Sequence, residues 1–175
     1  MTGDDFVLYE EDMHSIQEEL GRFLAESEAT CALLVHKSGQ LVAKRGFTQR
    51  LDTTSLAALA AGAFASTKEI ARLVGEPEFS VLFHQGQHEH IHVSLVGQHA
   101  IMVVLFDDRT TIGMVRLFAS ECAPRLSNIF QLAAERDVSS EQPVQAAVDA
   151  VADRSSVFAD KSGSIVPDTQ TAGPA

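Results

Sequence analysis

Three short apolar segments separated by glycine-containing turns constrain the fold of this chain most strongly. The segments run from Phe79 to Gln85, from His88 to Val96 and from Ala100 to Phe106, and Gly86 and Gly97 mark the turns between them. Turns this short join antiparallel neighbours, because a parallel crossover needs a dozen or more residues. The sequence therefore predicts an antiparallel three-stranded meander over residues 79–106.

A helix and a hairpin are predicted before this meander. Residues from about Tyr9 to Ser27 place apolar side chains at helical spacing. Cys31–Val35 and Leu41–Ala43 are apolar and flank the turn Lys37–Gln40, which is the pattern of two paired strands. The first of these strands is apolar throughout, so we expect helices on both faces of its sheet.

A long central helix is predicted from Asp52-Thr53-Thr54 to about Val74. Short oxygen-bearing side chains cap a helix start, and Gly75 with Pro77 ends it. Periodicity predicts that one side of this helix is buried. The residues expected on that side are Leu56, Leu59, Ala60, Ala63, Phe64, Thr67, Ile70, Leu73 and Val74.

The last predicted helix follows the polar segment Asp107–Thr111, with apolar residues recurring at helical spacing from Val115 to Ala133. Pro124 is expected to kink or split it. The predicted fold is therefore α/β. It is an αββαβββα layered sandwich around a mainly antiparallel five-stranded sheet.

The chain is expected to comprise one domain over residues 1–136 and an acidic tail over residues 137–175. The tail is rich in Ser, Asp, Gln, Ala and Pro, which is typical of disorder. Within it, residues 143–153 are predicted to form a short helix that needs a surface on which to dock. Its apolar stripe comprises Val144, Ala147, Val148 and Val151.

Composition excludes several classes of protein. A formal net charge of −11 argues against binding to nucleic acid or an anionic membrane. No apolar run reaches the ~18 residues of a membrane span, and the N-terminus lacks a signal-peptide pattern, so we expect a cytoplasmic protein without membrane insertion. Cys31 and Cys122 are expected to be reduced, buried thiols.

Motifs for catalysis or nucleotide binding are missing from the sequence. It contains no G-x-x-x-x-G-K-[ST], G-x-G-x-x-G, G-x-S-x-G, H-E-x-x-H or C-x-x-C. We therefore expect no catalytic residue, no metal and no cofactor. Asp107, Asp108 and Arg109 are interpreted as a helix cap with a local ion pair rather than as an acid–base pair.

Histidines gather on the meander and leave one alternative open. His88, His90 and His92 alternate along one predicted strand, and His84 and His99 lie in its neighbours. Two such imidazoles could ligate zinc, although no cysteine lies near to complete a site. A half-exposed polar strand face is the favoured interpretation.

The outer face of the central helix indicates a protein interface. Ala58, Ala61, Gly62 and Ala65 leave a low surface where solvent-facing helices usually carry long polar side chains, and Glu69 and Arg72 follow. Glycine in mid-helix costs about 1 kcal/mol relative to alanine, which a close helix contact would offset. A symmetric homodimer would cover this face, and pairing of residues 79–85 with their copy would extend the sheet across both subunits.

The order of elements and five stretches resemble the Roadblock/dynein light chain family and, within it, the bacterial MglB proteins. The likeness covers most of residues 9–135. The stretches that carry it are Leu51–Gly62, Gly75–Phe79, Phe83–Gly86, His90–Ser94 and Phe106–Leu117.

The resemblance implies a homodimer that binds a Ras-like small GTPase of the MglA type and accelerates GTP hydrolysis without an arginine finger. It also implies a role in cell polarity or motility. Ala58, Ala61, Gly62, Ala65, Glu69 and Arg72 are then the expected dimer or partner contacts. Two alternatives stay open, namely a Roadblock scaffold that binds a GTPase without activating it, and a small-ligand or metal-sensing domain.

Overall fold

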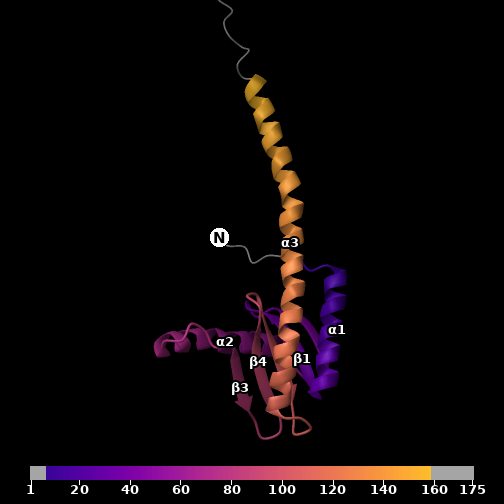
Figure 1. The fold of residues 1–175 in the computed structure, drawn as a ribbon, viewed down its shortest axis with the longest axis vertical. Coiled ribbons are helices and arrows are strands. Elements are labelled where there is room, and N and C mark those ends of the chain that lie inside the picture. Colours follow the sequence, from indigo (N-terminus) through magenta and orange to yellow (C-terminus); the bar gives the residue numbers. More distant parts are fainter. Residues whose placement is uncertain (1–6, 159–175) are drawn as a thin grey trace, which may run out of the picture. The chain divides into compact units, whose positions relative to one another are not determined.

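Five strands form a single antiparallel sheet with the order β2-β1-β5-β4-β3. The computed structural model describes residues 7–158, and the side chains of residues 7–136. The element order confirms the predicted α/β αββαβββα fold (Figure 1). The strands are β1 (Cys31–His36), β2 (Leu41–Gly46), β3 (Val81–Gln85), β4 (His90–Val96) and β5 (Ala100–Phe106).

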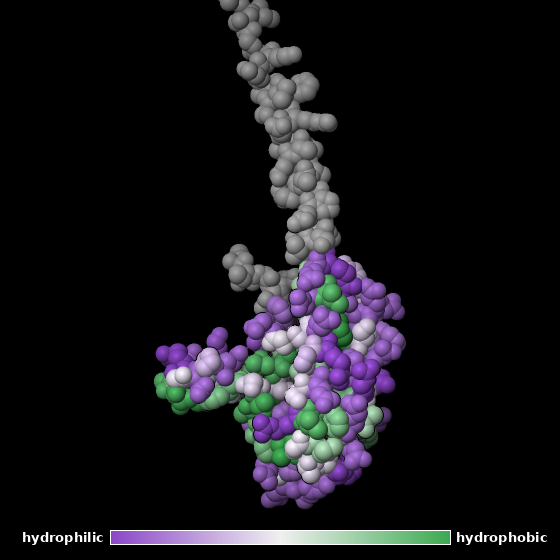
Figure 2. All heavy atoms as spheres, viewed as in Figure 1, coloured by the Kyte–Doolittle hydropathy of each residue, from purple (hydrophilic) through white to green (hydrophobic). Residues whose placement is uncertain are grey.

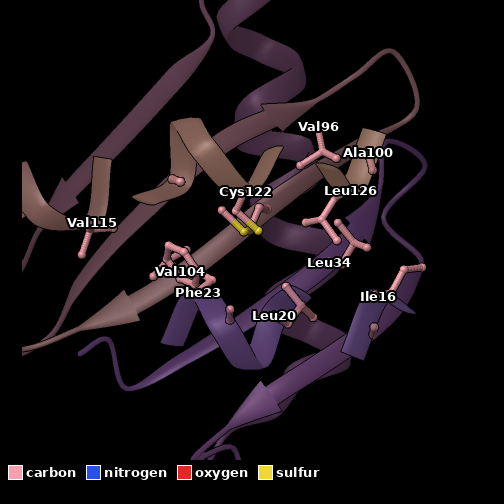
Figure 3. Close-up of a cluster of buried hydrophobic side chains, with 14 of the residues drawn as sticks. Ile16, Leu20, Phe23, Leu34, Val96, Ala100, Val104, Val115, Cys122 and Leu126 are labelled. Carbon is pink, nitrogen blue, oxygen red and sulfur yellow. The ribbon is translucent and has the colours of Figure 1, made fainter. Parts of the chain in front are cut away.

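Helices cover both faces of this sheet. On one face, α1 (Glu10–Ser27) and the part of α3 (Ile112–Phe158) up to Phe130 pack against the sheet, and on the other face lies α2 (Thr53–Val74) (Figure 1). Each face has its own hydrophobic core. Figure 3 shows the core on the α1 and α3 side, where Phe23, Leu34, Val104, Cys122 and Leu126 come together.

The central strands are buried on both faces because their side chains alternate between the two cores. In β1, Leu34 faces α1 and α3, whereas Leu33 and Val35 face α2. All seven residues of β5 are buried. A fully buried Leu or Val side chain contributes about 1.5–3 kcal/mol, so these two strands anchor the sheet. The prediction that the first strand is covered on both faces is confirmed.

Local capping explains where α2 begins and ends. The Oδ1 atom of Asp52 accepts a hydrogen bond from the backbone N–H of Ser55 at 3.1 Å, and the Ser55 hydroxyl donates to Oδ2 at 2.6 Å. Gly75 ends the helix in the left-handed region, with φ +80°. Both boundaries agree with the sequence prediction.

The β3–β4 hairpin has shorter strands and a longer turn than predicted. β3 begins at Val81 rather than Phe79, and β4 begins at His90 rather than His88. The intervening backbone folds closely on itself, because a Cβ atom on Gly86 would collide with the carbonyl oxygen of Glu89. Residues 86–89 therefore belong to the turn.

The predicted split of α3 at Pro124 is wrong. The helix runs through this position, although proline removes one backbone hydrogen bond. Cys122 and Leu126 on either side are completely buried against the core, and this packing holds the segment helical.

The chain divides into two units, residues 1–135 and residues 136–175. The α3 backbone continues in the second unit to Phe158. The predicted docking stripe of Val144, Ala147, Val148 and Val151 lies outside the described side chains, and residues 159–175 lie outside the described chain. The acidic tail with its docking helix stays a prediction. Within the described residues, no helix is both long and apolar enough to cross a bilayer.

Candidate functional site on the outer face of α2

Small residues bring α2 close to the sheet. The helix contacts β1, β2 and β5, and the side that faces them carries Ala57, Ala60, Ala61 and Phe64. Three alanines in two turns allow a close approach between helix and strand, with Phe64 filling the core beside them. The contact side of α2 is therefore narrow and rich in alanine.

The predicted orientation of α2 is partly wrong. Ala61, expected on the outer face, is only 6% exposed and packs against the sheet. Leu59, Ile70 and Leu73, expected on the inner face, are 72%, 51% and 77% exposed. The helix is apolar on two sides, so periodicity alone could not show which side meets the sheet. The small side fits there because the backbone lies close to the strands.

The exposed apolar residues Leu59, Ile70 and Leu73 lie in one row of α2 with the half-buried Ala63 and the exposed Ser66, and we define these five residues as the seam. Their spacing alternates between four and three residues. This is the heptad pattern of a helix that packs along another helix. Figure 2 shows hydrophobic surface along one side of the part of α2 that extends past the sheet. Contiguous exposed apolar surface of this kind marks a protein–protein interface.

Beside the seam lies a flank, which we define as Ala58, Gly62, Ala65, Glu69 and Arg72. All five residues are exposed. A Cβ atom on Gly62 would have nothing described within 4 Å, so the mid-helix glycine serves no contact inside this part of the chain. Arg72 Nε donates to Glu69 Oε2 at 3.0 Å. The structure therefore places the predicted interface residues on one exposed surface, with the exception of Ala61.

The seam is a feature that the sequence interpretation missed. Its signal was present in the spacing of Leu59, Ile70 and Leu73, but these residues were assigned to the core because they are large and apolar. The outer surface of α2 therefore has two chemically different parts. The seam carries large apolar side chains, whereas the flank carries small side chains and ends in the ion pair of Glu69 and Arg72.

The edge strand β3 is a second exposed feature, in addition to the outer surface of α2. Within the described residues it pairs with β4 alone. Val81 and Phe83 are 36% and 38% exposed, and the ring of Phe83 lies 6.2 Å from those of both His90 and Phe106. An open strand edge with exposed apolar side chains is suited to pairing with a further strand.

The histidines of the meander do not converge. His90 and His92 point toward the α3 face of the sheet, whereas His84 pairs with Ile91 and points toward the α2 face. Among the described residues, no three His, Cys, Asp or Glu side chains come close enough to hold a metal ion. Burial and the nearby charge of Arg116 lower the pKa of His92 to about 4, so its imidazole is neutral at physiological pH.

The corner between β5 and α3 has the predicted ion pair, but the helix cap is Thr111 rather than Asp107, Asp108 or Arg109. Arg109 Nε donates to both carboxylate oxygens of Asp107, at 2.8 and 3.0 Å, and this hydrogen bonding lowers the pKa of Asp107. The Thr111 hydroxyl oxygen accepts from the backbone N–H of Met114 at 3.3 Å and caps α3. Cap and ion pair account for this segment.

Comparison with known proteins identifies a family with this fold and, within it, relatives of higher sequence identity. The model of the Roadblock/LC7 domain matches residues 15–106. No curated protein sequence matches the chain significantly. A Roadblock/LC7 domain structure from Streptomyces avermitilis, 14% identical with a TM-score of 0.52, shares the fold.

The solved structures include relatives of higher identity. Myxococcus xanthus MglB is 39% identical, with a TM-score of 0.68 over 73% of this chain and 96% of that chain. The gliding protein MglB from Thermus thermophilus is 30% identical, with a TM-score of 0.70 over 75% of this chain and all of that chain. A structure described as MglB with a tetrameric arrangement is 30% identical, with a TM-score of 0.71 over 75% of this chain and 99% of that chain. The chain therefore belongs to the Roadblock/LC7 family and is similar to its bacterial MglB members.

Proposed function

We propose that this chain is a cytoplasmic, homodimeric regulator that activates a Ras-like small GTPase of the MglA type. The observation that carries the proposal is the outer surface of α2, where an apolar seam and a low flank lie exposed on a chain similar to MglB over nearly the whole length of that relative. Two chemistries on one helix suit two partners.

The seam supports the homodimer. Leu59, Ile70 and Leu73 would pack against the same residues of a second copy, because a two-fold axis brings identical surfaces together. Burying these side chains stabilises the dimer by about 25 cal/mol for each Å² of apolar surface removed from water. The open edge of β3 would pair with its copy and continue the sheet. The tetrameric arrangement named for one relative is consistent with self-association.

The flank supports the contact with the GTPase. Ala58, Gly62 and Ala65 present little side-chain bulk, so a partner surface could approach the helix backbone closely. Glu69 and Arg72 add polar specificity at the end of this surface. The chain would act by binding the hydrolysis-competent conformation of the GTPase more tightly than its other states, without an arginine finger.

A pair of substitutions tests the two contacts separately. Leu59→Glu should convert the dimer into monomers in analytical ultracentrifugation. Ala65→Arg should leave the dimer intact and abolish stimulated phosphate release by the MglA-type GTPase encoded nearest to this chain. The matched control is Ala25→Arg on the exposed side of α1, which should change neither property.

The outcomes separate activation from simple binding. Unchanged stimulation by Ala65→Arg would overturn the GTPase contact on the flank. Stable binding of the GTPase without faster phosphate release would favour the scaffold function instead. A dimer that survives both Leu59→Glu and Ile70→Glu would show that the seam is not the dimer contact.

The tail is proposed to act on nucleotide exchange. Its stripe of Val144, Ala147, Val148 and Val151 would dock on the GTPase. Val148→Asp would then change the rate of nucleotide release while leaving the melting temperature unchanged. An unchanged rate would count against a docking helix.

A further inference from the structure

A groove separates the β3–β4 hairpin from the first turns of α3. It has a volume of about 450 Å³, within the size range of small-molecule sites. It lies on the face of the sheet opposite to α2, away from the seam and the flank. Its residues His92 and Ser94 pair with Val104 and Met102 of β5, whose side chains belong to the α1 and α3 core. Its polar lining comprises Ser80, His92, Ser94, Arg116 and Ser120.

Two of these polar side chains are almost completely buried and have atoms without a hydrogen-bond partner. His92 is 1% exposed and Ser94 is 7% exposed. Neither Nδ1 of His92 nor Oγ of Ser94 forms a hydrogen bond with any described group. Buried polar atoms in native proteins nearly always have a partner, which is a protein group or a bound molecule such as water. His92 and Ser94 therefore supply two hydrogen-bonding atoms for a group that enters the groove.

The charge of the groove indicates which chemical group would bind there. Arg116 is exposed at the groove, and within residues 7–136 no acidic side chain forms an ion pair with it. His92 is neutral at physiological pH, and Arg116 is the charged group that acts on it most strongly. The groove thus offers one positive charge, and a single negative charge balances it.

The remaining walls select the rest of the ligand. Val81, Leu117, Ala119 and Ala123 line the groove with aliphatic carbon. A phosphate dianion would bring a second charge that nothing here neutralises, whereas a short aliphatic chain would bury apolar surface against these walls.

We propose that this groove binds a small organic acid through its carboxylate, with a short apolar chain lying along α3. Arg116 would neutralise the carboxylate, and the Ser94 hydroxyl and the protonated Nδ1 of neutral His92 would donate hydrogen bonds to it. The site uses none of the residues of the α2 outer surface, and of its lining Val81 also belongs to β3, the strand that the proposed dimer would pair with its copy.

The test is isothermal titration of the full-length chain with hexanoate, compared with hexylamine and inorganic phosphate. Hexanoate should bind saturably at one site per chain, and the other two probes should not. Arg116→Gln and Ser94→Ala should each weaken binding about tenfold or more, the effect expected for losing a charged hydrogen bond. The matched control Arg50→Gln, which removes an exposed arginine after β2, should bind as the parent does.

A second measurement reports on the site directly. Bound carboxylate should raise the pKa of His92, observed from the ring resonances by NMR, because a nearby negative charge favours imidazolium. Absence of saturable hexanoate binding up to about 10 mM would overturn the proposal. Three further results would overturn it as well. They are an affinity of Arg116→Gln for hexanoate equal to that of the parent, competition by phosphate as strong as that by hexanoate, and binding of an acidic peptide in place of hexanoate. Arg116 is exposed, so its substitution decides the question even if Ser94→Ala fails to fold.

Discussion

Arg125 of α3 donates a hydrogen bond from Nε to Oε2 of Glu19 in α1 at 2.7 Å, joining the two helices that cover one face of the sheet. The Oε1 atom of Glu19 lies 3.1 Å from Arg22 Nη1. The side chain of Glu19 is only 15% exposed, so this carboxylate serves two arginines in a partly desolvated position.

Glu19→Gln should therefore destabilise the protein by about 1 kcal/mol, more than an exposed ion pair contributes. The control is Glu18→Gln, which removes an exposed carboxylate paired with His14 and should change stability by less than about 0.5 kcal/mol. Urea unfolding at one protein concentration measures both. Equal effects of the two substitutions would show that the helix-to-helix bond adds nothing.

Alanine substitutions of Gly46 and Gly75 distinguish the cost of a steric collision from the cost of backbone strain. Both have positive φ, at +94° and +80°. A Cβ atom on Gly46 would lie 2.6 Å from the carbonyl oxygen of Thr30 and 2.8 Å from the Cα of Cys31, whereas a Cβ on Gly75 would meet nothing described within 4 Å. Gly75→Ala should cost about 1 kcal/mol from strain alone. Gly46→Ala should cost about 3 kcal/mol or more, since rigid backbone must shift as well. Similar losses in thermal unfolding would contradict this account.

Burial of His92 makes stability depend on pH. Its pKa is about 4 in the folded protein and near 6.5 when unfolded. Between these values the unfolded state binds more protons, so this group lowers stability as pH falls from about 6.5 to about 4 and adds no further change below. The loss should be about 3 kcal/mol. His92→Asn should flatten this part of the pH profile in urea unfolding, while the carboxylates titrate alike in both proteins. An unchanged profile would mean that His92 is solvated.

Cys31 and Cys122 should be unreactive in the folded protein. Both are free and completely buried, which confirms the sequence prediction, and burial raises the pKa of each thiol to about 11. A thiol-specific reagent at pH 8 should modify neither residue within minutes and both after denaturation, because only the thiolate reacts. Rapid native modification of Cys122→Ala, which retains Cys31 alone, would place Cys31 at the surface.

The sequence alone was sufficient for the order of elements, the capping of α2 by Asp52, the doubly buried first strand and the family. The first three depend on local rules, since a cap, a turn or an apolar strand is encoded within a few neighbouring residues. The family was inferred from the resemblance of five stretches. The continuity of α3 through Pro124 was not predictable in this way. Burial of Cys122 and Leu126 against a distant sheet outweighs the local cost of proline.

The orientation of α2 was decided by tertiary structure. Its sequence carries two apolar sides, and only the fit of Ala57, Ala60 and Ala61 to the sheet leaves Leu59 and Ile70 outside. The groove that joins Ser94 to Arg116 was likewise invisible in sequence, because β4 and α3 meet there only after folding. Local sequence thus determined which helices and strands form, apart from the continuity of α3 through Pro124. Packing between distant segments determined which of their surfaces remain free to bind a partner, since close contact depends on side-chain volume that periodicity does not measure.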